Sequence, residues 1–226
     1  MSDEIAARVR AVRRTIALAL ARAGDPGRSV TIVAVTKTMP ATVVDGVAAA
    51  GILDIGESRV QEASEKAPAV RAAVRWHLVG HLQRNKARRA AGLFSVIHSV
   101  DSTELLATLG GSGRPLQVFL EVNVAGDPRK HGAPPARARD ILRGALGIGT
   151  LEVLGLMTVA PLDADPRPSF RALRELRDDL NRAGDGPPLR CLSMGMSGDY
   201  EVAVEEGATH VRIGTALVGA RTPPAR

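Results

Sequence analysis

The chain has 226 residues, a length that α/β barrels commonly reach as one domain. Its hydrophobic fraction is 45% and its aromatic fraction only 2%, so Ala, Val, Leu and Ile must fill the core. The net charge of +6 is spread from Arg8 to Arg226, with its densest run at residues 84–89, which favours a solvated helix face over a nucleic-acid-binding patch.

The first predicted element is an amphipathic helix over residues 3–23. Apolar residues recur in it at spacings of three and four, which places them on one face of an α-helix. They are Ile5, Val9, Val12, Ile16 and Leu20. The Gly and Pro residues at positions 24–27 then end the helix.

After this helix, short apolar, β-branched runs alternate with helical stretches. Eight strands are predicted, at residues 30–35, 52–55, 76–79, 96–100, 118–124, 153–159, 189–192 and 211–213. Helices are predicted between them at residues 42–50, 59–73, 86–92, 102–109, 135–146, 168–183 and 200–206, and a last short helix follows Thr215. Strands that alternate with helices pair in parallel through crossover connections.

Eight such units predict a closed (β/α)₈ TIM barrel with an extra N-terminal helix. An open, doubly wound parallel sheet is the alternative. No linker is long enough to divide the chain, so residues 1–226 are expected to form a single domain. The last residues, 222–226, are expected to be a frayed tail.

The single cysteine, Cys191, excludes an internal disulfide, and its apolar neighbours predict a buried structural thiol. No signal peptide is visible, and no stretch reaches the roughly 18 uncharged apolar residues of a membrane span. We therefore expect a cytoplasmic protein without a membrane partner. The five histidines are dispersed and lack paired-ligand spacing, so no metal site is expected.

Lys37 ends the first predicted strand. In an α/β barrel, the residues that carry the chemistry gather at the carboxyl ends of the strands. A lysine that projects into the barrel mouth has its pKa lowered by burial and by nearby cations, and it is then a nucleophile that forms an imine with an aldehyde. A lysine that points to solvent is the alternative on this segment alone.

The loops after the seventh and eighth predicted strands lie where barrels usually bind phosphate. They offer hydroxyl groups and glycines, which permit close backbone approach: Ser193, Ser197, Thr215, Gly195, Gly198 and Gly214. Backbone N–H groups at the start of the following helices favour an anion, and Asp199 is expected to cap the first of these helices. The sequence thus predicts a phosphate site; two ordinary turns are the alternative.

Other polar residues follow the second and third strands. Glu57 is expected to cap the next helix and Arg59 to pair with it. His77 alternates with apolar residues, which is typical of a structural histidine. Three further candidates lie near strand ends and point to the mouth by position: His81, Asn123 and Met157.

These segments together resemble the pyridoxal phosphate homeostasis proteins, the YggS/PROSC family. The matching segments are AVTKT at 34–38, IGESRVQE at 55–62, WHLVGHLQRNK at 76–86, GLM at 155–157, LSMGMSGD at 192–199 and VRIGTALVGAR at 211–221. They run in family order and cover nearly the whole chain. SMGMS together with RIGTALVGAR is the most specific part.

The resemblance implies an alanine-racemase-like barrel that binds pyridoxal 5′-phosphate (PLP) as a Schiff base on Lys37. It implies phosphate contacts from the loops of Ser197, Gly214 and Thr215, and it places Arg212 against the pyridine nitrogen. The remaining candidate cofactor-binding residues are Ser58, His81, Asn123, Met157 and Ser193. Ser58 stands where the family usually has Asn, and His81 where it often has Pro, so these two positions bear on affinity.

The resemblance also implies a non-catalytic carrier that buffers or supplies the cofactor in vitamin B6 homeostasis, with apo-enzymes as receiving partners. Arg212 agrees with this role, because an arginine only donates hydrogen bonds and leaves the ring nitrogen unprotonated, which weakens carbanion stabilisation. A monomer is expected.

An amino-acid racemase of the same barrel type is the alternative. Racemisation needs two bases, and Lys37 supplies one. The related racemases take a tyrosine from an additional β-domain across a dimer, which is not expected here, and the only tyrosine of this chain, Tyr200, opens a predicted helix. An imine-forming aldolase and a binding module without cofactor are weaker alternatives.

Overall fold

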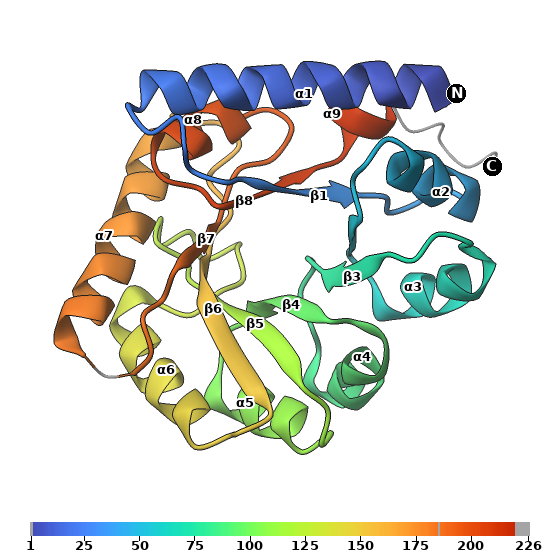
Figure 1. The fold of residues 1–226 in the computed structure, drawn as a ribbon. Helices are drawn as coiled ribbons and strands as arrows, with labels where there is room; N and C mark the ends of the chain where they lie inside the picture. Colours follow the sequence, from blue (N-terminus) through green and yellow to red (C-terminus); the bar gives the residue numbers. More distant parts are fainter. Residues whose placement is uncertain (1, 185, 220–226) are drawn as a thin grey trace.

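The computed structural model describes residues 2–184 and 186–219, which form a closed barrel of eight parallel strands (Figure 1). The strands follow one another around the barrel in chain order, and β8 pairs with β1 to close it. This arrangement confirms the predicted TIM barrel and excludes the open doubly wound sheet, which would leave two edge strands.

The strands are β1 (Thr31–Val35), β2 (Asp54–Glu57), β3 (Arg75–Leu78), β4 (Val96–Val100), β5 (Leu116–Glu121), β6 (Leu151–Met157), β7 (Cys191–Ser193) and β8 (His210–Ile213). The α-helices are α1 (Ser2–Arg22), α2 (Ala41–Ala49), α3 (Val60–Lys66), α4 (Ala87–Leu93), α5 (Thr103–Gly110), α6 (Ala138–Leu146), α7 (Arg167–Ala183), α8 (Tyr200–Glu205) and α9 (Thr215–Val218). Short 3₁₀ turns occur at Ala67–Ala69, Arg84–Lys86 and Pro135–Arg137.

The helix predicted at residues 59–73 is shorter in the structure. It ends at Lys66, and the 3₁₀ turn Ala67–Ala69 follows. Pro68 explains the break, because proline has no N–H and its ring displaces the carbonyl of the preceding turn. The expected cap was also wrong: the first turn of α3 has no side-chain cap, and Glu57 lies buried in β2 instead.

Apolar side chains fill two regions of the barrel. A small cluster of Val96, Phe119 and Met157 is separate from the main core. The larger core includes the apolar stripe of α1, which packs against α2, α8 and α9. In Figure 1, α1 runs along the outside of the barrel beside α8 and α9.

Two further sequence expectations have outcomes in this fold. Asp199 stands at the cap position of α8, but its carboxylate accepts a hydrogen bond from the N–H of Met196 (2.5 Å) and does not bond the helix. Cys191 is half-buried and not fully buried as expected, and this burial raises the pKa of its thiol. The expected frayed tail lies outside the described residues. No helix of the described segments has the length and apolar character needed to cross a membrane.

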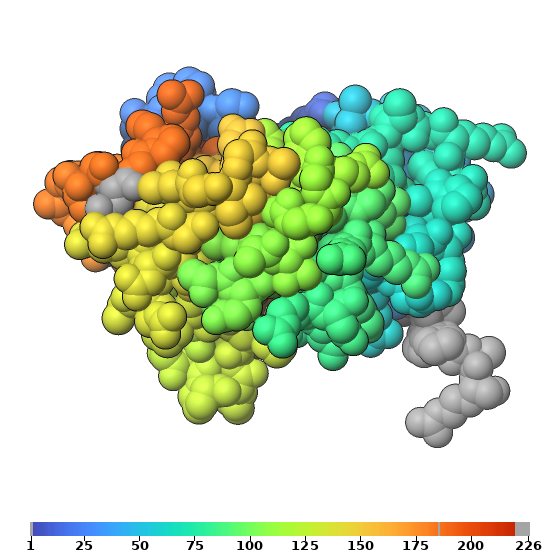
Figure 2. All heavy atoms as spheres, turned by 90° about the horizontal axis from the view of Figure 1, so that it is seen from below, coloured from blue at the N-terminus to red at the C-terminus, as the bar shows by residue number. Residues whose placement is uncertain are grey.

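All eight strands run in the same direction, so their carboxyl ends share one mouth of the barrel. The loop after β5 is the longest connection on that side and is tied back by a bridge between Val122 and Ala133. In the space-filling view this yellow-green segment projects at the lower edge of the molecule (Figure 2).

Candidate functional site at the carboxyl end of the barrel

The residues predicted to form the site lie at or just beyond the carboxyl ends of the strands. Lys37 follows β1, Ser58 follows β2, His81 follows β3 and Asn123 follows β5; Met157 and Ser193 end β6 and β7, Arg212 lies in β8, Ser197 follows β7, and Gly214 and Thr215 follow β8. Parallel strands thus bring residues from distant parts of the sequence to a single mouth.

A buried ion pair holds the backbone that leads into Lys37. Lys66 Nζ donates to the carbonyl oxygen of Thr36 (2.9 Å) and to Glu57 Oε1 (2.6 Å). The hydroxyl of Thr36 also donates to Glu57 Oε1, at 2.7 Å. Burial raises the pKa of Glu57, while Lys66 and Thr36 act to lower it. The sequence analysis expected Glu57 to pair with Arg59, and this prediction was wrong. In the structure Glu57 pairs with Lys66.

The backbone that leaves Lys37 is held as well. The N–H of Thr38 donates to Glu62 Oε1, which also accepts from Lys66 Nζ at 3.0 Å. Thr38 has φ of 66°, a left-handed conformation that is uncommon for threonine. Such backbone conformations gather at functional positions, where the surrounding structure holds them in place. Lys37 thus sits on a segment that is anchored on both sides.

Ser197 and the start of α9 form a cluster of hydrogen-bonding groups. Ser197 Oγ accepts from the N–H groups of Gly214 (3.2 Å) and Ala216 (3.4 Å). Gly195 has φ of +94°, and a Cβ atom there would lie 2.5 Å from the Cβ of Ala203. Only glycine therefore lets the loop after β7 pass so close to α8. The structure brings the predicted Ser197 and Gly214 into direct contact.

Lys37 and this cluster lie on neighbouring strands at the seam that closes the barrel. In the β1–β8 pair, Val33 is opposite Arg212 and Ala34 is opposite Ile213. A Cβ atom at Gly214 would lie 3.5 Å from the carbonyl oxygen of Val35. The segments that carry Lys37 and Gly214 therefore leave the barrel side by side.

Arg212 is buried next to this seam and is only 4% exposed. Its Nη1 donates to Ser193 Oγ (2.7 Å) and its Nη2 to the carbonyl oxygen of Thr158 (2.9 Å). Burial lowers the pKa of Arg212 to about 10, against the opposing charges of Glu121 and Asp199. The guanidinium is therefore still protonated at neutral pH, and two contacts fix its orientation.

Glu121 ends β5 and was missed by the sequence analysis. Burial raises the pKa of its carboxyl to about 7, a shift that the charge of Arg212 opposes and that of Asp101 reinforces. Among the described residues, no group donates a hydrogen bond to its buried Oε2 atom. The available signal was an acidic residue at the end of an otherwise apolar strand.

Met157 and Asn123 have different surroundings. Met157 is 1% exposed and packs with Phe119. Asn123 Nδ2 donates to the carbonyl oxygens of Asp127 (2.8 Å) and Lys130 (3.5 Å), so its amide stabilises its own loop. A role for either residue toward a cofactor stays a prediction.

Ser58 and His81 meet at the rim of the mouth, where they line one cavity of about 240 Å³. A Cβ atom at Gly80 would lie 2.3 Å from the carbonyl oxygen of Ser58, so a glycine is required where the two loops touch. His81 stacks on His131, with ring centroids 3.9 Å apart and planes 9° from parallel. The stack links the loops that follow β3 and β5.

Two buried histidines approach the site from within the barrel. His77 was predicted to be structural and is indeed fully buried, and His98 was not singled out. The ring of His98 stacks on Phe119 (centroids 4.5 Å apart), and its Nδ1 lies 2.8 Å from Ser193 Oγ. Within residues 2–184 and 186–219, no cluster of three or more His, Cys, Asp or Glu side chains is placed to hold a metal ion.

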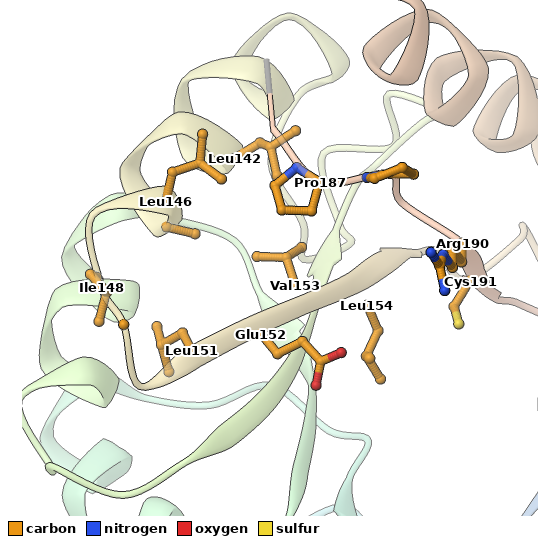
Figure 3. A pocket seen from close by; sticks show the side chains of 13 residues that line it. Leu142, Leu146, Ile148, Leu151, Glu152, Val153, Leu154, Pro187, Arg190 and Cys191 are labelled. Atoms are coloured by element: carbon orange, nitrogen blue, oxygen red, sulfur yellow. The ribbon is translucent and has the colours of Figure 1, made fainter. Parts of the chain in front are cut away.

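A larger cavity, of about 470 Å³, lies at the opposite end of the barrel near the amino ends of β6 and β7. Leu142 and Leu146 of α6 and Pro187 point toward Val153 of β6, whereas Glu152 points away from them (Figure 3). Its lining is mainly apolar and includes none of the predicted site residues, so we place the functional site at the other mouth.

Comparison with known proteins identifies the relatives of this chain. A family model described as "Alanine racemase, N-terminal domain" matches residues 8–222. The pyridoxal phosphate homeostasis protein of Aquifex aeolicus is 39% identical over 222 residues, which cover 95% of this chain and 97% of that protein. The human protein of the same name is 36% identical over 235 residues, covering 94% and 85%.

Solved structures agree with this relationship. PipY of Synechococcus elongatus, solved with PLP bound, is 35% identical, has a TM-score of 0.83 and covers 95% of this chain and 100% of its own. Alanine racemase from Corynebacterium glutamicum has a TM-score of 0.72 at 14% identity, covers all of this chain and 62% of its own, and shares the fold. The extent and identity of these matches place this chain in the pyridoxal phosphate homeostasis protein family, with a barrel of the alanine racemase N-terminal type.

Proposed function

We propose that this protein binds pyridoxal 5′-phosphate as a Schiff base on Lys37 and acts as a non-catalytic carrier that buffers the cofactor or supplies it to apo-enzymes. The cofactor enters the proposal through the relatives: they are named pyridoxal phosphate homeostasis proteins, and PipY was solved with PLP bound. The assignment to Lys37 rests on the geometry of this chain.

One observation carries the assignment: the anchored segment of Lys37 and the Ser197–Gly214 cluster leave the barrel side by side at the β1–β8 seam. A single small molecule that has an aldehyde at one position and a phosphate at another requires an amine and a set of N–H and hydroxyl donors on one wall of its site. Adjacent strands provide both.

The chemistry of the donor set fits this cofactor. The oxygen of Ser197 already collects two backbone N–H groups, which are the donors that a phosphate oxygen accepts from. The guanidinium of Arg212 supplies a buried cation with further N–H groups. When bound, PLP supplies a reactive aldehyde and an electron-withdrawing ring.

Arg212 supports a carrier in preference to a catalyst. Because Arg212 remains protonated at neutral pH, it would donate a hydrogen bond to the ring nitrogen of bound PLP and would not protonate it. An unprotonated ring withdraws electrons weakly, so Lys37 holds the cofactor without strongly activating a bound amino acid. The only tyrosine in the sequence, Tyr200, starts α8, and no observation here favours a racemase.

The central experiment traps the link to Lys37. Purified protein incubated with PLP is expected to absorb visible light near neutral pH, and borohydride reduction should leave a stable adduct. The sequence contains four lysines, at positions 37, 66, 86 and 130, so peptide mapping identifies the labelled one. Lys37→Ala should abolish the adduct, whereas Lys86→Ala, which removes an exposed lysine of the β3–α4 loop, should retain it.

Two results would reject this proposal: a protein that stays colourless after PLP addition, or an adduct that persists in Lys37→Ala.

Release of the cofactor is tested in a separate experiment. A small amine added to the loaded protein should free the cofactor by exchange, and an apo-enzyme added in its place should regain activity at the rate of that release.

A further inference from the structure

Five polar side chains form an unbroken series of hydrogen bonds from the site across the barrel. Arg212 Nη1 contacts Ser193 Oγ (2.7 Å), which contacts His98 Nδ1 (2.8 Å). His98 Nε2 contacts His77 Nδ1 (2.9 Å), and His77 Nε2 contacts Asp54 Oδ1 (2.8 Å). We call these five residues the Arg212–Asp54 chain; it crosses β8, β7, β4, β3 and β2.

The interior of the Arg212–Asp54 chain is closed to solvent. Ser193, His98 and His77 are 0% exposed, and only the Asp54 side chain, at 25%, reaches the surface. Buried polar atoms that lack partners are costly, at about 1–3 kcal/mol each, so the protons along the chain must satisfy every atom at once. The chain therefore has few allowed proton arrangements.

The two ends fix the direction of the chain. Arg212 has only donor groups, so its N–H must donate to Ser193. Asp54 is the acceptor at the other end: burial acts to raise its pKa, but the hydrogen bond from His77 and the charge of Arg75 bring it below its ordinary value. Arg75 Nη1 lies 3.7 Å from Asp54 Oδ1. A carboxylate ion can only accept, so every hydrogen bond between the two ends must run toward Asp54.

Both histidines are neutral in this arrangement. Burial lowers the pKa of His77, although the hydrogen bond to Asp54 and the charge of Asp54 oppose this shift. Burial takes the pKa of His98 well below its ordinary value, and the neighbouring charges of Arg212 and Arg75 act in the same direction. His210, in edge contact with His98 at 6.3 Å between centroids, is half-buried, and this burial lowers its pKa to about 4. At neutral pH, Arg212 is therefore the only positively charged member of the Arg212–Asp54 chain.

A neutral imidazole has one N–H and one acceptor nitrogen, which determines each proton. His77 must carry its proton on Nε2 to donate to Asp54, so its Nδ1 accepts from His98 Nε2. His98 then accepts at Nδ1 from the hydroxyl of Ser193. With its proton engaged by His98, the hydroxyl of Ser193 presents only lone pairs to Arg212.

We propose that His98 and His77 are positioning residues that orient the Ser193 hydroxyl, and through it the guanidinium of Arg212, toward the cofactor. This inference rests on the proposed function, in which Arg212 faces the ring nitrogen. If His98 no longer accepted from Ser193, the hydroxyl proton would be able to turn toward Arg212 Nη1. Arg212 would then keep only its contact with the Thr158 carbonyl.

Two amides at position 98 separate the links of the chain. In His98→Gln the side-chain end replaces Nε2, which keeps a donor for His77 but removes the acceptor for Ser193. In His98→Asn the side-chain end replaces Nδ1, which keeps an acceptor for Ser193 but removes the donor for His77. The variants are matched in chemistry, and each breaks one buried hydrogen bond, so a merely structural role predicts similar effects for both.

PLP affinity is the first measurement. His98→Gln and Ser193→Ala should each raise the PLP dissociation constant by about 3- to 10-fold, the effect of one lost hydrogen bond, whereas His98→Asn should change it less than about twofold. Adduct formation on Lys37 at saturating PLP should be unchanged in the two His98 variants. Equal affinity loss in the Asn and Gln variants, or none in the Gln variant, would overturn the proposal.

Nuclear magnetic resonance tests the proton positions in the Arg212–Asp54 chain without cofactor. The ¹⁵N shifts of the wild-type protein should show Nε2–H tautomers for both histidines, and the Arg212 Nη protons should give separate, slowly exchanging signals that merge in His98→Gln. An Nδ1–H tautomer on either ring contradicts the proposal. If wild-type protein forms no adduct on Lys37, the proposed function fails. These signals would still test the direction of the hydrogen bonds in the Arg212–Asp54 chain.

A milder variant covers the case in which His98→Gln does not fold. Asp54→Asn removes the charge at the exposed end and allows an amide N–H to turn toward His77, so an Nδ1–H population should appear on His77. Glu175→Gln, which neutralises an exposed carboxylate of α7 away from these residues, is the control and should leave both tautomers unchanged. An Asp54→Asn protein with wild-type tautomers would show that Asp54 does not set the direction.

Discussion

At the scale of single residues, the carboxyl of Glu121 should make stability depend on pH. Its pKa is raised from 4.5 to about 7, chiefly by burial, and the side chain is only 7% exposed. Between these two pH values the folded state holds a proton that the unfolded state has lost. Stability from this group is therefore fully present below about pH 4.5 and falls as the pH rises toward 7, by roughly 2–3 kcal/mol in total.

Glu121→Gln removes this dependence because the amide stays neutral. The free energy of unfolding of the variant minus that of the wild type should rise by roughly 2–3 kcal/mol between pH 4.5 and pH 7.5, and then level off. Urea titrations at a series of pH values measure it, and Glu175→Gln, on the exposed side of α7, is the control. A difference that is flat across this range would mean that Glu121 is ionised throughout.

The residues that could be predicted for the site are those that a strand end exposes in the sequence. Lys37, Ser197 and Gly214 belong to this class, because each follows an apolar run by a few positions. His98 and Glu121 do not, since their importance comes from neighbours on other strands. Whether a buried strand histidine meets a serine 95 residues away depends on the barrel register, which no local pattern contains.

At the scale of elements, β6 and β7 approach each other more closely than side chains allow. Gly155 is paired with Cys191, and a Cβ atom at Gly155 would lie 1.8 Å from the carbonyl oxygen of Cys191. Gly155→Ala must therefore separate the two strands or bend them. We expect a loss of about 2–4 kcal/mol in the free energy of unfolding, measured by urea denaturation.

Gly92→Ala is the matched control for this substitution. Gly92 is exposed within α4, and nothing lies within 4 Å of the position that its Cβ would take. Alanine there should stabilise the protein by about 0.5–1 kcal/mol, because it favours the helix and restricts the unfolded chain. A Gly155→Ala protein as stable as the wild type would show that the strands separate without cost.

The existence and order of the elements followed from the sequence, while their ends depended on contacts across the sheet. The strand predicted at residues 96–100 matches β4. β5 and β6, by contrast, begin two residues earlier than predicted, at Leu116 and Leu151, where the N–H of Leu116 is bonded to the carbonyl of Thr150 on the neighbouring segment. Pairing thus extends these strands beyond their β-branched runs.

At the scale of the whole molecule, α1 lies outside the barrel but belongs to its core. It covers the seam region by packing against α2, α8 and α9, and its stripe from Ile5 to Leu20 is buried. A helix that shares so much apolar surface with the barrel should unfold together with it. The single tryptophan, Trp76, lies in β3 and reports on the barrel itself.

Two substitutions on α1 test this cooperativity. Ile16 is 6% exposed and Leu18 is 56% exposed, so Ile16→Ala should lower the free energy of unfolding by about 2–4 kcal/mol and Leu18→Ala should change it by less than about 0.5 kcal/mol. The loss in Ile16→Ala should shift the urea midpoint equally in far-ultraviolet circular dichroism and in Trp76 fluorescence. If only the circular dichroism midpoint moves, α1 unfolds separately, and the barrel that carries Lys37 and Arg212 is stable without it.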